Sequence, residues 1–364
     1  LAEFDTAPPA EEPDLPPAKV FLQQPMAFFR TGWRPGDTLL VLTNMRLKAG
    51  HEHFDRGSLI FEFNGEPLLL DPGMIFYGSP NAAQYRATCN HSTLTFSQRD
   101  QLGDRAPYNT AIDAVLSTSG DCCPGHAGGI DWAVASVGAV YPEAEQFHRH
   151  LIFLRPDVCV LIDEVKAKEP ESVELNFNCL GRLSRSGDLF QSTTDSNRLL
   201  IHPQSKHELE FRTNEWQTSV ANTPSDRLVV SRFQPHRDCT FLTTLAPHPL
   251  DGETPSIESL KLEAGLGVRI RRRDVRIRRR DVRIRRRDEE VIVLVRETVA
   301  GTMSAEGVTT DARIAVIRRV GALVTGAAML DGTHLATAGG DNLLPSVEPG
   351  LTGGVLVDGA WKTH

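Results

Sequence analysis

Short apolar runs, separated by residues that favour turns, recur along most of this chain. They are clearest between residues 147 and 246, where the runs are Leu151–Leu154, Val158–Ile162, Val173–Cys179, Leu199–His202, Glu208–Arg212, Leu228–Phe233 and Thr240–Ala246. Many short strands at such spacing are typical of packed antiparallel sheets and not of alternating strands and helices. We therefore predict an all-β fold, an antiparallel β-sandwich of supersandwich-like form.

The same pattern divides the chain into three parts. Residues 1–19 are rich in Pro and Glu and are predicted to be a linker. The β-sandwich domain is expected over residues 20–300, starting with strands at Phe28–Trp33 and Thr38–Thr43. Short apolar pieces separated by glycines predict a small C-terminal β extension over residues 301–364. The first residue is not Met, so we expect the chain to be part of a longer protein.

The strongest local signal is a β-hairpin. Asn64-Gly65 lies between two apolar runs, which predicts strands at Ser58–Phe63 and Pro67–Asp71 joined by a tight turn. Counting outward from the turn places Ser58 opposite Asp71. The loop that precedes Ser58 would then begin at the same end of the hairpin as Asp71.

Three metal-type ligands could meet at that end of the hairpin. His53 lies in the preceding loop, Asp71 ends the second strand, and His91 begins the next strand-like run. Two imidazoles and a carboxylate form a ligand set that suits Zn²⁺. Spacing alone leaves an alternative open, because a His-x-His pair in a loop is often solvated and Asp before Pro-Gly is also a common turn residue.

Residues 50–93 carry a series of motifs in a fixed order: Gly-His-x-His-x-Asp-x-Gly-Ser, an apolar strand, Asn-Gly, Leu-Leu-x-Asp-x-Gly and Tyr-Arg-x-Thr-x-x-His-x-Thr. This order resembles that of the heparinase II/III-like polysaccharide lyases, a group that includes related alginate lyases. The similarity continues through His148-Arg149-His150 and Val158–Asp163. The usual His-Asn-Thr is His91-Ser92-Thr93 here, which keeps the histidine and changes its neighbour.

This resemblance implies an activity and a division of roles. The chain would be the β-sandwich part of a lyase that cleaves a uronic-acid-containing, acidic polysaccharide by β-elimination. His53, Asp71 and His91 would bind a structural zinc ion, and His51 would face the substrate. Tyr77 and Tyr85 are further candidates for catalytic hydroxyls, although each could instead be a packed tyrosine with its hydroxyl at the sheet edge.

The family also implies a partner domain and a location. An N-terminal helical toroid, which this chain does not contain, supplies the principal tyrosine and an asparagine or histidine. We therefore expect the chain alone to be inactive or weakly active. Members of the family suggest a periplasmic or secreted location, although this chain has no signal peptide.

Two other functions remain open from the residues. One is a non-catalytic carbohydrate-binding β-sandwich whose metal is purely structural. The other is a cupin-like metalloenzyme, because His-x-His before a hairpin also begins that type of metal site. A cupin would need a Glu shortly after the histidine pair, whereas Glu62 lies on the predicted hairpin.

Residues 268–288 repeat the heptapeptide Val-Arg-Ile-Arg-Arg-Arg-Asp three times. Without two copies the sequence is an ordinary hairpin, so we infer a tandem duplication inside it. The extra copies form either a basic surface for an anionic polysaccharide or a tolerated, solvated loop.

Composition narrows the remaining classes. The net charge of −8 argues against nucleic acid as a partner of the whole chain, because only the repeat is strongly basic. No apolar run is long enough to span a bilayer. The six cysteines show no CxxC spacing, and Cys159 and Cys179 are predicted to be buried free thiols within apolar strands.

Overall fold

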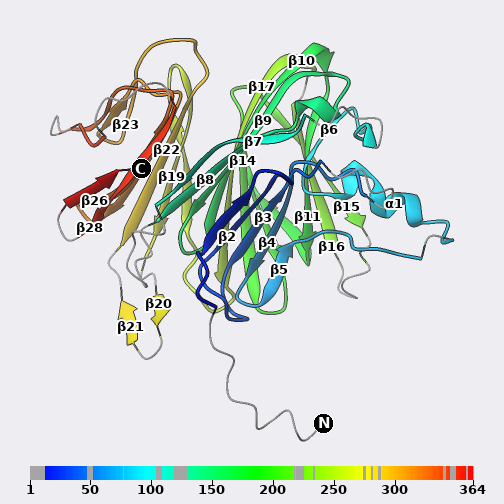
Figure 1. The fold of residues 1–364 in the computed structure, drawn as a ribbon, viewed down its shortest axis with the longest axis horizontal. Helices are drawn as coiled ribbons and strands as arrows, with labels where there is room; N and C mark the ends of the chain where they lie inside the picture. The colour runs from blue at the N-terminus through cyan, green and yellow to red at the C-terminus, as the bar shows by residue number, and fades with distance from the viewer. Residues whose placement is uncertain are drawn as a thin grey trace, which may run out of the picture.

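The computed structural model describes residues 13–46, 52–76, 78–103, 109–118, 129–216, 218, 225–232, 234–273, 276–279, 282–285, 288–338, 342–344, 350–357 and 360–363. Within these ranges the regular secondary structure is almost entirely antiparallel strand, as predicted, and it forms three large sheets that we call A, B and C. None of these sheets closes into a barrel. Figure 1 shows them as layers, with sheet B between sheets A and C.

Sheet A contains the metal-type ligands and their surroundings. Its strands, in spatial order, are β1 (Ala18–Phe21), β2 (Met26–Arg30), β3 (Leu39–Thr43), β4 (Ser58–Phe63), β5 (Glu66–Leu69), β11 (Val173–Leu180), β16 (Ser225–Arg232) and β15 (Leu209–Trp216), while β6 (Leu94–Phe96) also pairs with β11. Helix α1 (Ala82–Arg86) and the 3₁₀ turn η2 (Thr88–Asn90) connect β5 to β6. Figure 1 shows α1 at the far side of sheet A from sheet C.

Sheet B is the central layer. Its order is β12 (Arg182–Ser186), β13 (Leu189–Thr193), β14 (Asn197–Gln204), β17 (His236–Pro249), β10 (Val158–Glu171), β9 (Ala144–Leu154), β8 (Ile130–Ser136) and β7 (Ala111–Ser117), with the turn η4 (Gly138–Val140) before β9. Alternate residues of β9 face opposite cores: Phe147 and Leu151 pack toward sheet A, and Ile152 packs toward sheet C. Burial on both faces explains why its strands read as continuous apolar runs.

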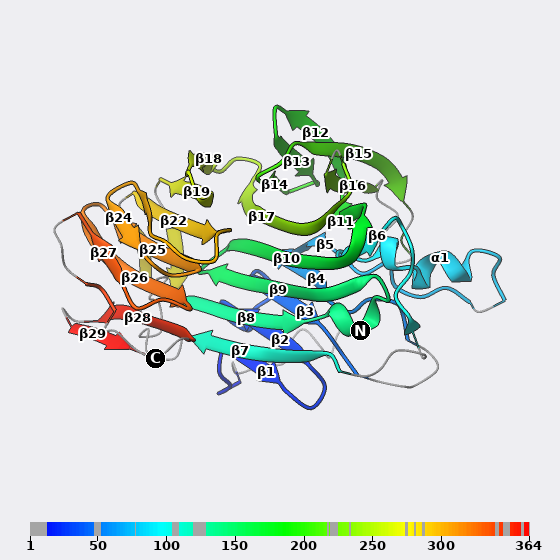
Figure 2. The ribbon, with the colours of Figure 1, turned by 90° about the horizontal axis from the view of Figure 1, so that it is seen from above.

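Sheet C packs on the other face of sheet B, at the end of the sheet where β9 turns into β10 (Figure 2). Its order is β18 (Ser256–Lys261), β19 (Gly265–Arg272), β22 (Glu289–Arg296), β25 (Ile314–Val320), β26 (Leu323–Leu330), β28 (Leu351–Val357) and β29 (Ala360–Thr363). A small sheet of β23 (Met303–Ala305), β24 (Val308–Thr310) and β27 (Leu335–Thr337) packs on its outer side. The expected boundary at residue 300 thus falls between strands that share one sheet.

The Arg-rich repeat divides between two hairpins. Its first copy lies in β19, which pairs with β22 so that Arg272 is opposite Glu289. The later copies contribute β20 (Arg276–Arg279) and β21 (Val282–Arg285), which pair with each other. Figure 1 shows this second hairpin beyond the end of β19 and β22.

The hairpin predicted around Asn64-Gly65 is present, but its register differs from the prediction. Asn64 and Gly65 have φ values of 52° and 81°, which is the left-handed pair that a tight hairpin turn requires. A β-bulge then places Phe61 opposite Leu69, and β5 ends at Leu69. The expected pairing of Ser58 with Asp71 is therefore wrong, because an extra residue on β5 shifts the strand before it reaches Asp71.

Candidate metal centre

Two chain segments meet beside the middle of β11. β6 pairs with the first half of β11, where Leu94 is opposite Leu175, and β5 pairs with its last part, where Leu69 is opposite Cys179. Strand β16 occupies the other edge of β11 throughout. The chain leaving β5 and the chain entering β6 therefore end at one gap in sheet A.

The three residues expected as metal ligands come together at this gap. Ligand atoms of His53, Asp71 and His91 all lie within 4.8 Å of one another. Nδ1 of His91 lies 3.1 Å from Oδ2 of Asp71, and the ring centroids of the two histidines are 5.2 Å apart. His91 is fully buried, whereas His53 and Asp71 are half-buried. Each ligand comes from a different segment of the chain.

The surroundings of His91 fit a bound cation. Both ring nitrogens of His91 are buried. Nε2 has no hydrogen-bond partner among the described residues, and Nδ1 has only the contact with the Asp71 carboxylate at 3.1 Å. A buried polar atom without a partner is costly. A divalent ion would satisfy it, and the set of two nitrogens and one oxygen suits zinc.

Asp71 is placed both to shape a turn and to bind a metal, the two roles that its sequence context allowed. Its Oδ1 accepts a hydrogen bond from the Gly73 amide at 2.8 Å, as an Asp that shapes a turn does, while Oδ2 faces His91. Burial alone would raise the pKa of the Asp71 carboxyl, but the contacts with His91 and Gly73 outweigh it and lower the pKa. The carboxylate form, which can bind a metal, is therefore favoured.

The electrostatics of His53 favour its neutral form. Burial, and then the neighbouring His91, lower the pKa of His53 below 6.5, although Asp71 and Asp55 oppose the change. A neutral imidazole has the lone pair that a metal ligand needs. Burial raises the pKa of Asp55, a carboxyl that interacts with His91 and Arg56.

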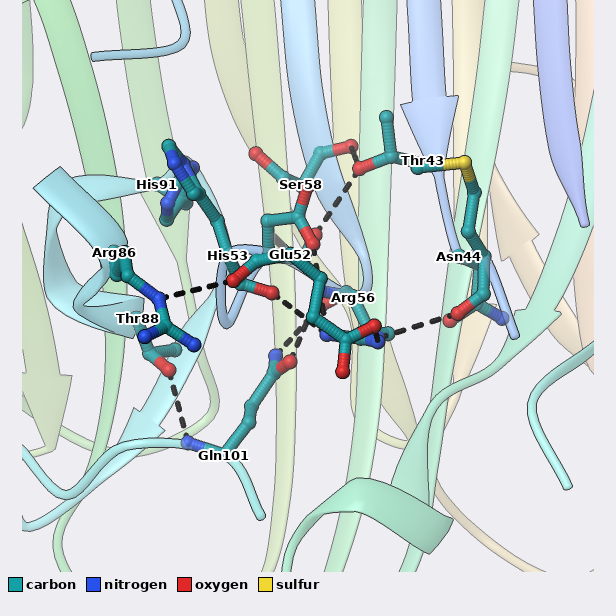
Figure 3. A network of polar contacts seen from close by, with 12 residues as sticks. Thr43, Asn44, Glu52, His53, Arg56, Ser58, Arg86, Thr88, His91 and Gln101 are labelled. Carbon is teal, nitrogen blue, oxygen red and sulfur yellow. Dashed lines mark hydrogen bonds and ion pairs between the residues drawn. The ribbon is translucent and has the colours of Figure 1, made fainter. Parts of the chain in front are cut away.

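A network around Arg56 fixes the loop that carries His53 (Figure 3). Nη1 of Arg56 donates to the His53 carbonyl at 2.6 Å, and Nη2 pairs with Glu52 at 2.7 Å. Gln101 accepts from the Arg56 amide at 3.0 Å and donates to its carbonyl at 2.8 Å. Thr93 donates from Oγ1 to the same carbonyl at 2.9 Å, which links this loop to the segment after His91.

Helix α1 is attached to the same loop. Nε of Arg86 donates to the Glu52 carbonyl at 3.1 Å, and the Phe54 amide donates to the Arg86 carbonyl at 2.9 Å (Figure 3). Tyr85 precedes Arg86 on this helix and is half-buried. The other two catalytic candidates, His51 and Tyr77, lie outside the described residues.

Our interpretation of the sequence missed the residues that support the ligands. Arg56 lies inside the motif that contains His53, so the sequence could have indicated it. Gln101 had no such signal, because it lies in an irregular segment and contacts Arg56 from 45 residues away.

A known protein family matches most of the chain. The profile of the family described as "Heparinase II/III-like, C-terminal" matches residues 17–291, which is most of the chain. The chain belongs to this family. The cupin-like alternative is thereby set aside, and Glu62 is not among the clustered ligands. No curated protein sequence matches the chain closely enough to count as a relative.

Solved structures support the family fold. The heparan sulfate lyase HepC from Pedobacter heparinus is similar with a TM-score of 0.59 at 16% identity, covering 71% of this chain and 41% of that one. The heparinase III BT4657 gene product has a TM-score of 0.59 at 18% identity, with the same two coverages. A further heparinase III structure has a TM-score of 0.56 at 16% identity, covering 70% of this chain and 40% of that one.

The chain spans about two-fifths of the length of these structures. Within the part of the chain that the structure describes, no helix is long and apolar enough to cross a bilayer.

Proposed function

We propose that this chain is the β-sandwich part of a polysaccharide lyase and that His53, Asp71 and His91 bind a structural zinc ion in it. The observation that carries the metal proposal is the convergence of the three ligand atoms within 4.8 Å beside β11. The lyase proposal is supported by family membership and by similar structures named as heparan sulfate lyase and heparinase III. These names favour an acidic polysaccharide as the substrate.

The proposed zinc has a structural purpose. The zinc ion would join the loop before β4, the end of β5 and the segment before β6. Hydrogen bonds such as that from Thr93 to the Arg56 carbonyl also link these segments. Three protein ligands leave a position open on a tetrahedral ion. Elimination requires no metal-activated hydroxide, so we assign zinc the role of organising these segments.

Cleavage of a uronic-acid polysaccharide by β-elimination needs three groups. One neutralises the carboxylate, a base removes the proton from the adjacent carbon, and an acid protonates the departing glycosidic oxygen. The C–H electron pair becomes the new C=C bond, and the C–O electron pair leaves with the oxygen. His51 is our candidate for neutralising the carboxylate, and Tyr77 and Tyr85 are candidates for the proton transfers.

The proposed zinc site can be tested by metal analysis. We expect the purified chain to bind one zinc ion, and His53→Ala, Asp71→Ala and His91→Ala each to lose it, because two ligands rarely hold zinc in a structural site. His207→Ala, at an exposed histidine outside the cluster, is the matched control. Stoichiometric zinc in all three ligand variants would refute the site.

The lyase proposal needs a separate assay. The unsaturated product has a double bond conjugated to a carboxylate and absorbs in the ultraviolet. With heparan sulfate, alginate and other uronans as substrates, we expect this absorbance to grow with a longer protein that includes the helical toroid. Residues 1–364 alone should give little or none. Rapid growth with the short chain would contradict this division of the active site, and sugar binding without cleavage by the longer protein would favour a binding module.

A further inference from the structure

A buried ion pair in sheet B lies behind the metal centre. Arg149 on β9 and Asp163 on β10 are opposite each other in the register, and their side chains are 1% and 0% exposed. Nε of Arg149 donates to Oδ1 of Asp163 at 2.6 Å, and Nη2 donates to Oδ2 at 3.2 Å. Phe147 and Leu151, on the same face of β9, belong to the core between sheets A and B. The guanidinium therefore lies inside the sandwich and reaches sheet A.

The remaining nitrogen of this guanidinium binds both histidine-bearing segments. Nη1 of Arg149 donates to the Gly57 carbonyl at 2.5 Å and to the Ser92 carbonyl at 2.9 Å. Gly57 follows His53 by four residues, and Ser92 is the residue after His91. One side-chain nitrogen thus fixes the separation of the two backbone segments from which the histidines project.

Close packing leaves little freedom for these carbonyls. Gly57 has a φ of +77°, and a Cβ there would lie 3.1 Å from Oγ1 of Thr93 and 3.2 Å from Cγ1 of Val137. The Ser92 carbonyl also accepts a hydrogen bond from the Leu59 amide at 3.2 Å, at the start of β4. The loop and the segment after His91 are therefore packed against each other where Arg149 binds them.

Stability alone does not explain an ion pair in this core. Removing each ion from water costs several kcal/mol, which is on the order of the free energy that the attraction between the two ions contributes. Apolar residues of similar volume often stabilise a core as much as a buried ion pair does. A metal site, in contrast, requires its ligands to be held within about 0.5 Å of a working geometry.

We propose that Arg149, oriented by Asp163, is a positioning residue for the metal centre. It holds the His53 loop and the His91 segment at the separation that a shared cation needs. This inference rests on the proposed zinc site, because it concerns how that site is held together. Arg149 is not itself one of the proposed ligands.

Metal affinity of folded variants provides the test. Zinc affinity is measured by chelator competition on the full chain for wild type, Arg149→Met and Asp163→Asn, with circular dichroism and urea unfolding to confirm folding. We expect both variants to bind zinc more weakly by about 10-fold or more, the effect typical of groups that orient metal ligands. With Co²⁺ in place of zinc, we expect a changed visible spectrum, because the ligands would be less well ordered.

Arg318→Met is the matched control. Arg318 is 0% exposed, pairs with Glu289 and donates to a backbone carbonyl, but it lies between sheets B and C. We expect this variant to lose stability, while the folded protein binds zinc as tightly as wild type. This outcome would separate positioning of the metal ligands from the general cost of removing a buried arginine.

The outcomes distinguish this inference from the proposed function. If wild type binds no zinc, the zinc site fails, and the positioning role fails with it. If wild type binds zinc and a folded Arg149→Met protein binds it within twofold as tightly, the positioning role alone is wrong. Should Arg149→Met not fold, Arg149→Lys, which keeps the charge but not the fork, and Asp163→Asn decide the question by the same criterion.

Discussion

Two buried arginine clusters lie on opposite sides of sheet B, and they use the same chemistry for different purposes. The first is formed by strands of sheet B itself and the second by strands of sheet C. Arg149 pairs with Asp163 and donates to the carbonyls of Gly57 and Ser92, which flank two metal-type ligands. On the other face, Arg318 pairs with Glu289 and donates to the Arg155 carbonyl in the turn between β9 and β10. The first cluster arranges loops of sheet A, and the second connects sheet C to sheet B.

The two clusters also differ in how charge is shared. Asp163 is bound by one guanidinium, whereas Glu289 is bound by both Arg272 and Arg318 and is 1% exposed. Burial alone would raise the pKa of Glu289, but the two arginines outweigh it and lower the pKa. A change to Glu289 should therefore affect stability most, while a change to Arg149 should affect the metal centre most.

The largest expected effect is that of Glu289→Gln. The variant keeps the shape of the side chain and removes the carboxylate that Arg272 and Arg318 share. Arg272 keeps its ion pair with Asp157, but no other carboxylate among the described residues pairs with the buried Arg318, and breaking such a buried pair typically costs about 3–5 kcal/mol of unfolding free energy. Urea unfolding measures this loss, and zinc affinity of the folded variant should not change. Glu258→Gln is the control, because Glu258 pairs with Arg269 at the surface, where an ion pair contributes little to stability. A loss below about 1 kcal/mol for Glu289→Gln would remove the contrast between the clusters.

A second contact between sheets B and C should appear in the acid stability. Glu164 accepts from Nε2 of His150 at 2.8 Å and is bound by Arg313. Burial opposes ionisation, but His150 and Arg313 outweigh it and lower the pKa of Glu164 from 4.5 to about 2. Because the folded state binds this proton less readily, the stabilisation is present above pH 4.5 and is lost as the pH falls through about 2.

This shift corresponds to about 3 kcal/mol at neutral pH. We expect Glu164→Gln to be less stable than wild type above pH 4.5 and to approach it near pH 2, as measured by urea unfolding across that range. Glu145→Gln, which removes an exposed partner of Lys166, should keep a pH profile close to that of wild type. A Glu164→Gln profile parallel to wild type would show that this carboxyl does not couple the sheets.

Local features of the fold could be predicted from the sequence, and long-range ones could not. The Asn64-Gly65 turn was predictable because two adjacent residues determine it. The bulge after it was not, since it depends on how β5 meets β11. Residues on both sides of position 300 share sheet C, because Glu289–Arg296 pairs with Ile314–Val320, and this pairing has no local signal.

The candidate site shows the same limit. The motif predicted which residues could be ligands, and the structure brings His53, Asp71 and His91 together. Their support was not predictable, because Arg149 binds carbonyls that lie 92 and 57 residues away along the chain. Backbone carbonyls have no side-chain identity, so a sequence cannot indicate which of them an arginine binds.

The smallest expected effect is that of deleting residues 275–288. Arg272 pairs with Glu289, so the deletion leaves Arg273-Asp274 as a two-residue loop between β19 and β22. Closing the shorter loop costs less conformational entropy, which should stabilise the fold by about 1–2 kcal/mol. Arg-Asp is not a favoured two-residue hairpin turn, however, and the strain of this turn should offset that gain. We expect the unfolding free energy to change by less than about 1 kcal/mol and zinc affinity to stay the same.

The deletion also decides between the two interpretations of the repeat, because it removes eight Arg and two Asp. If the added copies are a tolerated insertion, the shortened chain should bind uronate polysaccharides as the parent chain does. Weaker binding with unchanged stability, most evident at low salt, would instead assign these copies to a basic polysaccharide-binding surface. A large loss of stability would contradict both interpretations, because it would mean that the added copies support the pairing of Arg272 and Arg318 with Glu289 in the cluster between sheets B and C.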